Sequence, residues 1–433
     1  MKYYSTNKNA PIVDLQEAVI KGLASDKGLY MPETIQRLPD SFFANISNLS
    51  FQEMAYEVAH AFFGEDIDET TLKTIVNDTL SFETPVVKVS DSIYALELFH
   101  GPTLAFKDVG ARFMARLLGY FIQKQGVKDV NVLVATSGDT GSAVANGFLG
   151  VNGIHVYVLY PKGKVSAIQE CQFTTLGQNI TALEIDGTFD DCQVLVKSAF
   201  MDDALNKKMK LTSANSINVA RFLPQAFYYF NAYAQLKKQG ITDDIVFCVP
   251  SGNFGNITAG LIAQKMGLPV KRFIAANNKN DIFLQYLLTG LYQPKTSIQT
   301  LANAMDVGDP SNFARILELY NHNHEIITQT IAGFSCDDES ICKTVKACYQ
   351  ATGYLLDPHG ACGYLALLEG LQANETGVFL ETAHPAKFKD TIDNIIQESI
   401  EIPEKLQVFM KGKKQSIELS REFNEFKAFL MKQ

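Results

Sequence analysis

The stretch VNVLVATSGDTGSAVANGFLG, residues 130–150, joins an apolar run to a helical pattern through a polar turn that contains glycine. The run VNVLVAT favours a buried strand, and GSAVANGFLG is typical of a helix. A strand that leads through a short loop into a helix is the first half of a βαβ unit. The stretch therefore predicts an open α/β fold, in which ligands bind where strand ends and helix starts converge.

The same rhythm continues on both sides of this stretch. Toward the C-terminus, strand runs alternate with helical patterns: HVYVLYP, VSAIQECQFTTLG, ITALEID and FDDCQVLVKSAF. The strand runs IVFCVP, KRFIAAN and GVFLETAH lie farther on, whereas the β-prone runs PVVKV and SIYALELF come before it. Alternation of strands and helices predicts βαβ units and a parallel sheet.

The chain has 433 residues, which is too long for a single hydrophobic core, so we expect more than one domain. We expect a mainly helical N-terminal region at 1–84 and a helical C-terminal tail at 396–433. Between them we expect two α/β domains. The larger domain would combine residues 85–123 and 211–395, and the smaller one would span 124–210.

The composition excludes several classes of partner. The net charge of −9 leaves no basic surplus to neutralise phosphates, so we expect no nucleic-acid partner. No run of about eighteen apolar residues is present, which predicts no membrane span, and the N-terminus lacks the pattern of a secretory signal. The seven cysteines are scattered and form no C-x-x-C motif, so neither a disulfide framework nor a metal site is expected. These features favour the cytoplasm.

The loop PSGNFGN, residues 250–256, lies between the strand run IVFCVP and a helical pattern. Its glycines let the backbone turn tightly beside an anion, and the helix behind it offers N–H groups and a positive dipole end. The lysine of a nucleoside-triphosphate loop is absent, and the spacing differs from the dinucleotide fingerprint. The pattern indicates a phosphate cradle. The alternative is a glycine-rich turn without a ligand.

Two further polar loops are candidates for chemistry. TSGDTG, residues 136–141, is rich in hydroxyls at a helix start, which suits a carboxylate or a second anion. The alternative for this loop is that Ser137 or Asp139 only caps the helix. TLAFKD, residues 103–108, places Lys107 between an apolar stretch and an amphipathic helix. Lys107 could form an imine with an aldehyde cofactor, or it could be one more solvated surface charge.

The segment HGPTLAFKD, residues 100–108, resembles the cofactor-lysine signature of the threonine synthase family of pyridoxal-phosphate (PLP) enzymes. Other segments resemble the same family in order and spacing: YYST (3–6), GLASD (22–26), GLYMP (28–32), SGDTGSA (137–143) and PSGNFGN (250–256). The resemblance spans nearly the whole chain. Small departures occur at Asn7-Lys8, where Arg-Gly is more usual, and at Lys27, where a glycine is common.

The resemblance implies the fold of the tryptophan-synthase-β-like PLP enzymes, called fold type II. This is an α/β fold of two parallel-sheet domains with PLP in the cleft between them. Lys107 would hold the cofactor as a Schiff base, and Thr382 would face its pyridine nitrogen. A hydroxyl cannot keep that nitrogen protonated, which suits elimination over transamination. The implied cofactor contacts are Lys107, Phe106, Asp139, Gly252, Asn253, Phe254, Gly255, Asn256 and Thr382.

The resemblance also implies a substrate, O-phospho-L-homoserine, that is converted with water to L-threonine and phosphate. Lys107 would move the Cα proton during a γ-elimination and the addition of water at Cβ. The guanidinium of Arg221 can make paired hydrogen bonds to phosphate oxygens, although a structural ion pair is its alternative role. The implied substrate contacts are Thr103, Ser137, Gly138, Thr140, Asn215, Ser216 and Arg221. We expect Asp139 to point at hydrogen-bond donors, because a carboxylate repels the substrate carboxylate.

Other functions remain open on the sequence alone. One is a related PLP phospho-lyase that releases 2-oxobutyrate. Another is a nucleotide-binding protein that uses the glycine loops, and a third is a binding module without catalysis. Lys162 and Lys164 are weaker phosphate candidates, and His322 with His324 is too small a set for a metal site. The enzyme would be a monomer or a homodimer.

Overall fold

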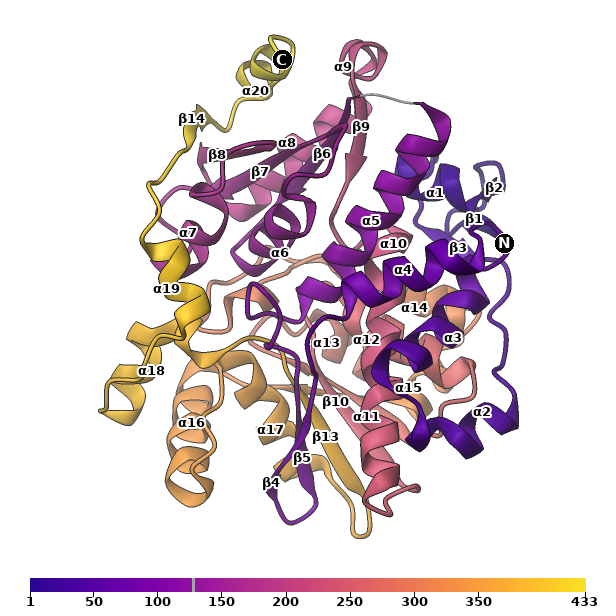
Figure 1. Ribbon diagram of the computed structural model, residues 1–433. Coiled ribbons are helices and arrows are strands. Elements are labelled where there is room, and N and C mark those ends of the chain that lie inside the picture. Colours follow the sequence, from indigo (N-terminus) through magenta and orange to yellow (C-terminus); the bar gives the residue numbers. More distant parts are fainter. Residues whose placement is uncertain (127–128) are drawn as a thin grey trace. The chain divides into compact units, whose positions relative to one another are not determined.

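The computed structural model describes residues 1–126 and 129–433, and the chain forms two compact units (Figure 1). Unit 1 contains Met1, Met31–Phe106 and Phe222–Glu401. Unit 2 contains Lys2–Tyr30, Lys107–Arg221 and Ile402–Gln433. The expected boundaries differ from this division, because 2–30, 107–123, 211–221 and 402–433 join the smaller predicted domain. Residues 127–128 of that predicted domain lie outside the described residues.

The sheet of unit 1 has six strands in the order β12-β11-β10-β13-β5-β4. Neighbouring strands are parallel except β4 and β5, which are antiparallel. The strands are β4 (Val86–Ser90), β5 (Ile93–Glu97), β10 (Ile245–Pro250), β11 (Arg272–Asn277), β12 (Ile331–Ser335) and β13 (Thr376–Glu381). The fully buried run of β10 fits a strand covered on both faces.

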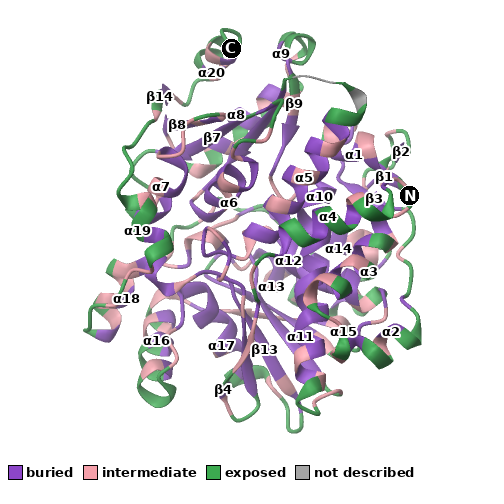
Figure 2. Cartoon of the chain, viewed as in Figure 1, coloured by how far each residue is buried: buried purple, intermediate pink, exposed green. Residues whose placement is uncertain are grey.

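Helices cover both faces of this sheet, and the two-residue period of the strands decides which side chains meet which helix. Val246 and Cys248 of β10 belong to a core shared with α16 (Asp338–Thr352), α17 (Pro358–Gly370) and α18 (Lys389–Ile396). Phe247, which lies between them, points to the opposite face and packs edge-on against Tyr229 of α11 (Ala226–Lys238). In Figure 2 β13 and α17 are mostly buried, whereas β4, α16 and α18 include intermediate and exposed residues.

The described part of unit 1 contains further helices. They are α2 (Asp40–Asn45), α3 (Phe51–Phe63), α4 (Glu69–Thr79), α12 (Gly255–Lys265), α13 (Ile282–Thr289), α14 (Phe313–Leu319) and α15 (His324–Thr330). The helix α3 begins with a capping box at Ser50 and Glu53 and packs its apolar face against α11.

Unit 2 contains a five-stranded sheet in the order β14-β8-β7-β6-β9, with every neighbouring pair parallel. Its strands are β6 (Val130–Ala135), β7 (Ile154–Pro161), β8 (Ile180–Asp186), β9 (Lys210–Ser213) and β14 (Ile417–Ser420). The unit's helices are α1 (Leu15–Lys21), α5 (Lys107–Gln125), α6 (Asp139–Phe148), α7 (Ala167–Thr174), α8 (Phe189–Met201), α9 (Asp203–Lys208), α19 (Glu404–Met410) and α20 (Phe423–Leu430), and α10 (Val219–Phe222) ends at the unit boundary. Leu133 and Leu159 form a core with α8 and α20.

The predicted strands of both sheets are confirmed, but three edge strands were missed. The segments KLTS, IAGFS and IELS form β9, β12 and β14. Each lies at the edge of its sheet and exposes part of its length, so none has the continuous apolar run of a central strand. The C-terminal tail is therefore not purely helical. The N-terminal region likewise adds β1 (Lys2–Ser5), β2 (Val13–Asp14) and β3 (Tyr30–Pro32) to its helices.

Within the described residues, the structure has no helix of the length and apolar character needed to cross a bilayer.

Candidate cofactor and substrate site

The loop at 250–256 joins β10 to α12 and leaves the start of that helix without a side-chain cap. Phe254 occupies the N-cap position in a left-handed conformation with φ of 61°, which is unusual for a bulky residue. Its ring is buried against Phe283, with ring centroids 4.7 Å apart. The first N–H groups of α12 are thus suited to an anion.

The side chains of this loop turn inward and fix its shape. Asn256 donates from Nδ2 to the carbonyl of Pro250 across the loop, at 2.8 Å. Asn253 accepts the N–H of Ser311 at Oδ1, at 2.6 Å. Because these amides are used for the fold, the backbone is the part of the loop that can meet a ligand.

Gly252 is required by the backbone that packs beneath it. A Cβ at this position would lie 2.5 Å from the carbonyl oxygen of Ala304 and 2.8 Å from Cα of Met305. No real Cβ tolerates such contacts, so any other residue would move the loop. The glycine therefore lets the loop approach the 304–305 backbone closely.

Thr382 follows β13, the parallel neighbour of β10, so it lies at the same edge of the sheet as the 250–256 loop. Its carbonyl accepts the N–H of Phe106 at 2.8 Å. The carbonyl of Phe106 accepts a hydrogen bond from the hydroxyl of Tyr228. Thr103 is also fixed here, because its carbonyl accepts Nζ of the buried Lys387 at 2.9 Å. The residue that precedes Lys107 in the chain is therefore held beside Thr382.

In unit 2, the 136–141 loop joins β6 to α6 and is organised by the hydroxyl of Thr136. That oxygen accepts the N–H of Gly138 at 2.9 Å and the N–H of Gly141 at 2.7 Å. The N-cap of α6 is Gly138, with φ of 145° and no side-chain capping bond. The alternative that Ser137 or Asp139 caps the helix is thus wrong. The hydroxyl of Thr136 thus takes the N–H groups of Gly138 and Gly141, and the positive dipole end of α6 still favours a carboxylate.

Asp139 points at a donor, as expected, although the donor is one that the sequence did not indicate. Its Oδ1 accepts Nε2 of Gln169 at 2.9 Å, and both side chains are buried. Gln169 also packs against Gly138, where a Cβ would lie 2.6 Å from its amide carbon. No motif in the sequence distinguishes this glutamine from others.

The segment after β9 lies beside the 136–141 loop, because β9 and β6 are parallel neighbours. Asn215 donates from Nδ2 to the carbonyl of Ala135, at the end of β6, at 3.1 Å. Arg221 is buried, with 2% of its surface exposed. Unit 2 therefore places Asn215 beside the end of β6, where the 136–141 loop begins.

Lys107 is the first residue of α5 and is half-buried. One turn later, Gly110 packs directly on the backbone of Arg221, where a Cβ would overlap the carbonyl oxygen. This contact holds the first turn of α5 against the 213–221 segment. The same unit thus carries both the candidate cofactor lysine and the candidate phosphate-binding arginine.

The weaker candidates have structural roles. Lys162 is half-exposed and pairs with Glu418 at 2.8 Å. His322 Nε2 pairs with Glu318 at 2.9 Å, and His324 bonds to the carbonyl of Tyr286 at 3.0 Å. No group of three or more metal-ligating side chains is found among the described residues.

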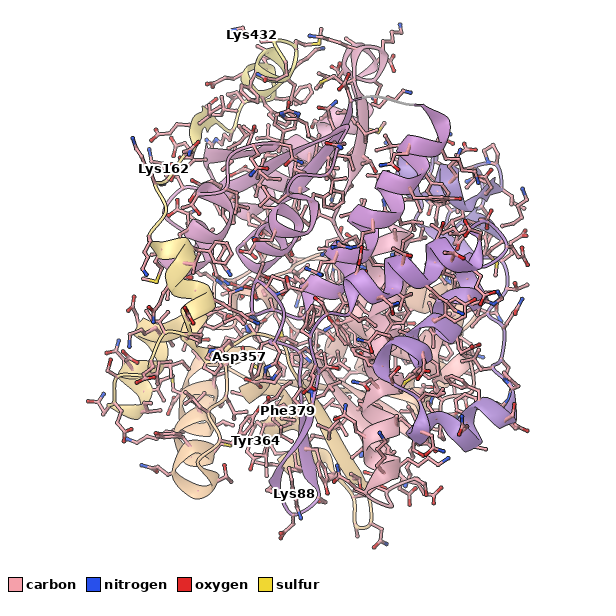
Figure 3. The ribbon with its side chains drawn as sticks, viewed as in Figure 1. Lys88, Lys162, Asp357, Tyr364, Phe379 and Lys432 are labelled. Carbon is pink, nitrogen blue, oxygen red and sulfur yellow. The ribbon has the colours of Figure 1, made fainter. Side chains whose placement is uncertain are left out.

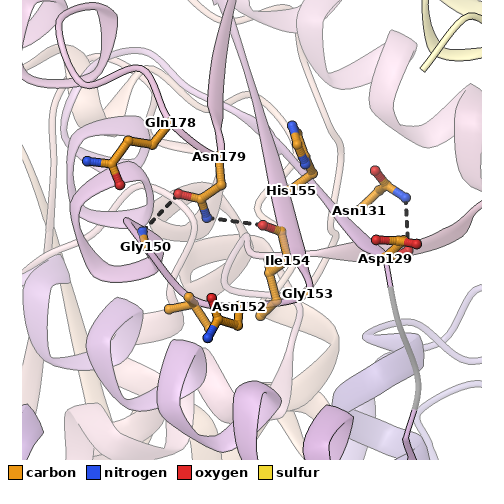
Figure 4. Close-up of a pocket in the computed structure, with 10 residues that line it drawn as sticks. Asp129, Asn131, Gly150, Asn152, Gly153, Ile154, His155, Gln178 and Asn179 are labelled. Carbon is orange, nitrogen blue, oxygen red and sulfur yellow. Dashed lines mark hydrogen bonds between the residues drawn. The ribbon is translucent and has the colours of Figure 1, made fainter.

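A shallow pocket of about 260 Å³ lies in unit 2, lined by Asp129, Asn131, Gly150, Val151, Asn152, Gly153, Ile154, His155, Gln178 and Asn179 (Figure 4). It includes the first residues of β6 and β7 and thus lies at the amino ends of the strands. Asn179 is already used there, since it accepts from Gly150 and donates to Phe148 and Ile154. Open α/β sheets bind ligands at the opposite, carboxyl ends.

These features fit the cofactor named by the sequence resemblance. The uncapped start of α12 and the bare Cα of Gly252 suit a phosphate. Thr382, at the neighbouring strand end, can face a ring nitrogen without placing a charge there.

Comparison with known families gives three matches. Residues 79–381 match the family described as "Pyridoxal-phosphate dependent enzyme". Residues 2–80 match "Threonine synthase N terminus", and residues 360–430 match "Threonine synthase, C-terminal".

Individual relatives match along their whole length. The threonine synthase of Haemophilus influenzae is 45% identical over 432 residues, which cover 100% of each chain. The crystal structure of threonine synthase from Escherichia coli has a TM-score of 0.94 and 41% identity, covering 100% of both chains. PLP-bound threonine synthase from Brucella melitensis has a TM-score of 0.92 and 33% identity, covering 99% of this chain and 98% of that one.

Proposed function

The chain belongs to the threonine synthase family of PLP-dependent enzymes, and from this premise we propose that it converts O-phospho-L-homoserine and water into L-threonine and phosphate. The α/β fold and the PLP cofactor expected from the sequence motifs are confirmed by the family matches and the solved structures. The proposal is carried by one observation above all. The N-terminus of α12, which suits an anion, lies at the same sheet edge as Thr382, in a chain that matches threonine synthases along its whole length.

Each candidate residue has a defined task in this proposal. The amine of Lys107 binds the cofactor aldehyde, removes the proton from the substrate Cα and later returns it. The backbone N–H groups of 252–256 hold the cofactor phosphate, and the hydroxyl of Thr382 faces the pyridine nitrogen. When bound, PLP supplies an electron sink for the charge left at Cα. Lys107 must be neutral at some steps and cationic at others.

The substrate would be held by unit 2. Ser137, Gly138 and Thr140 would bind its carboxylate at the start of α6. Arg221 would bind the substrate phosphate with a paired set of N–H groups, and Asn215 and Ser216 would add neutral hydrogen bonds. Loss of the phosphate from Cγ with a proton from Cβ would leave a carbon–carbon double bond, and a proton added at Cγ followed by water at Cβ would complete the conversion.

The product decides between this function and its alternatives. Purified protein with PLP and O-phospho-L-homoserine should release threonine and phosphate in equal amounts. Release of 2-oxobutyrate in place of threonine would identify the phospho-lyase alternative. Neither product, together with tight binding of a nucleotide, would favour the nucleotide-binding alternative.

The setting of the enzyme follows from its charge and thiols. We propose a cytoplasmic enzyme that acts on a small molecule as a monomer or homodimer, without a nucleic-acid partner. The net charge of −9 and seven free cysteines support this setting. Light scattering of the purified protein distinguishes the two oligomeric states.

A further inference from the structure

Two buried residues of unit 1, Asp357 and His359, lie outside the contacts assigned so far. Asp357 has 0% and His359 has 2% of its surface exposed. Asp357 is the N-cap of α17, and its side chain accepts the N–H of His359 at 2.7 Å. Figure 3 labels Asp357 with Phe379 of β13 and Tyr364 of α17. Buried polar side chains of this kind normally have partners that explain their burial.

On one side, Asp357 holds both neighbours of Thr382. Its N–H donates to Oε1 of Glu381 at 2.5 Å, and its Oδ2 accepts the N–H of Ala383 at 3.3 Å. The end of β13 is thus fixed on both sides of Thr382. Gly360 keeps this arrangement tight, because a Cβ there would overlap Oε2 of Glu381.

On the other side, His359 holds the floor of the phosphate loop. Its Nε2 accepts the N–H of Ala304 at 3.1 Å. The same Ala304 presents its carbonyl oxygen 2.5 Å from where a Cβ of Gly252 would lie. His359 therefore fixes the backbone on which Gly252 rests.

The hydrogen bonds also fix the proton positions in this cluster. Because Nε2 of His359 accepts, the proton lies on Nδ1, which donates to Oδ1 of Asp357 at 2.5 Å. Asp357 then accepts three N–H donors, as suits a carboxylate. Burial and the nearby charge of Asp357 raise the pKa of Glu381 well above its usual value.

We propose that Asp357 and His359 are positioning residues. They hold Thr382 and the phosphate loop at Gly252 in a fixed position relative to each other. One continuous path runs from Ala383 through Asp357, His359 and Ala304 to Gly252. This inference rests on the proposed function in so far as Thr382 and Gly252 face PLP. A cofactor bound there has its ring and its phosphate set by a single buried network, which preorganises the site.

The test uses full-length protein and three variants of α17. His359→Leu breaks both links of the imidazole, whereas His359→Gln keeps an oxygen that can accept from Ala304. Tyr364→Phe is the matched control, since it removes a hydroxyl from a buried residue of the same helix outside the path. Three readouts are followed: the Kd of PLP by fluorescence, the ³¹P line of its phosphate and the visible absorption of the lysine-bound cofactor.

We expect His359→Leu to raise the Kd of PLP about tenfold, as for a lost hydrogen bond in a buried site. Both the ³¹P line and the absorption band should shift. His359→Gln should restore most of the affinity, and Tyr364→Phe should leave all three readouts unchanged. If His359→Leu does not fold, Asp357→Asn supplies the same test, because it keeps the shape and replaces one acceptor with a donor.

Two results would overturn the inference. One is a Kd within twofold of the unsubstituted protein, with unchanged spectra, in both His359→Leu and Asp357→Asn. The other is an equal effect of Tyr364→Phe, which would mean that the residues only stabilise the fold. Failure of the proposed function is separate: the unsubstituted protein would bind PLP and release no threonine, while the cofactor readouts would still decide the inference.

Discussion

At the residue scale, Gly252 carries a prediction about volume. Gly252→Ala adds a Cβ that must lie 2.5 Å from the carbonyl oxygen of Ala304 unless the loop moves. Since a displaced loop no longer presents its N–H groups to one phosphate, PLP affinity should fall roughly tenfold or more. Gly370→Ala is the control, because its nearest neighbour would be Cδ1 of Ile274 at 3.5 Å. Equal PLP affinity in the two variants would contradict the proposal that the 250–256 loop binds the cofactor phosphate.

Arg221 carries a prediction about the substrate. Arg221→Lys keeps the charge and loses the planar fork, so the KM for O-phospho-L-homoserine should rise roughly tenfold or more. The Kd of PLP should stay unchanged, because the residue is assigned to the substrate phosphate alone. Steady-state kinetics and a PLP titration check both expectations. An unchanged KM would indicate that Arg221 does not bind the substrate phosphate and has a structural role instead.

His384 predicts how stability depends on pH. Burial, followed by the nearby His100, lowers the pKa of His384 to about 4, below the usual 6.5. The neutral form therefore stabilises the fold fully above about pH 6.5, and this contribution is lost as the pH falls toward 4. His384→Asn keeps an acceptor for the N–H of Ala386 and removes the titration. Urea unfolding at several pH values gives the free energy of unfolding, which should fall less steeply toward acid pH in this variant. The same dependence on pH in both proteins would show that His384 is not the source of the acid sensitivity.

The loops of the candidate site could be predicted from the sequence, but the buried side chains that support them could not. The cofactor loops stand out because glycine and hydroxyl residues follow apolar strands. Gln169, Asp357 and His359 are ordinary polar residues in sequence, and only the fold shows that Gln169 meets Asp139 and that His359 meets Ala304. Long-range pairings of this kind leave no periodic signal.

At the element scale, an ion pair ties β11 to the turn before β13. Arg272 donates from Nε and Nη2 to the two carboxylate oxygens of Glu375, at 3.0 and 2.6 Å. The hydrogen bond from Arg272 is the first cause that lowers the pKa of Glu375, to about 2. Glu375 therefore stabilises the fold above pH 4.5, and this contribution is lost as the pH falls toward 2.

Glu375→Gln should lower the free energy of unfolding by about 1–3 kcal/mol at pH 7, the cost of losing hydrogen bonds between charged groups. The loss should shrink as the pH falls toward 2, where about half of the carboxylate of the unsubstituted protein is protonated. Thermal unfolding at pH 7 and at pH 2 to 3 measures both. The exposed pair of Lys343 and Glu339 is the control, and Glu339→Gln should change little.

The elements that the sequence predicted are those with a strong local pattern. Central strands such as β10 show an unbroken apolar run, and α3 shows helical spacing behind a capping box. The missed strands β9, β12 and β14 lie at sheet edges and are only partly buried, so their side chains need not be apolar. Edge strands are therefore decided by tertiary contacts.

At the scale of the whole molecule, the chain alternates between its two units. Unit 2 takes residues 2–30, 107–221 and 402–433, and unit 1 takes Met1, 31–106 and 222–401. The expected boundaries differ from this division at residues 107–123, because α5 packs with α6 of unit 2. No shift of composition marks residue 107. The candidate cofactor lysine is thus the first residue after a crossing from one unit to the other.

The central claim is that the amine of Lys107 condenses with PLP, and reductive trapping measures it directly. Protein loaded with PLP is treated with borohydride and digested, and the peptides are sequenced by mass spectrometry. We predict a reduced cofactor adduct on Lys107, with Lys107→Ala losing both the adduct and the visible absorption band. An adduct on another lysine, such as Lys162 or Lys387, or none on the active protein, would contradict the account.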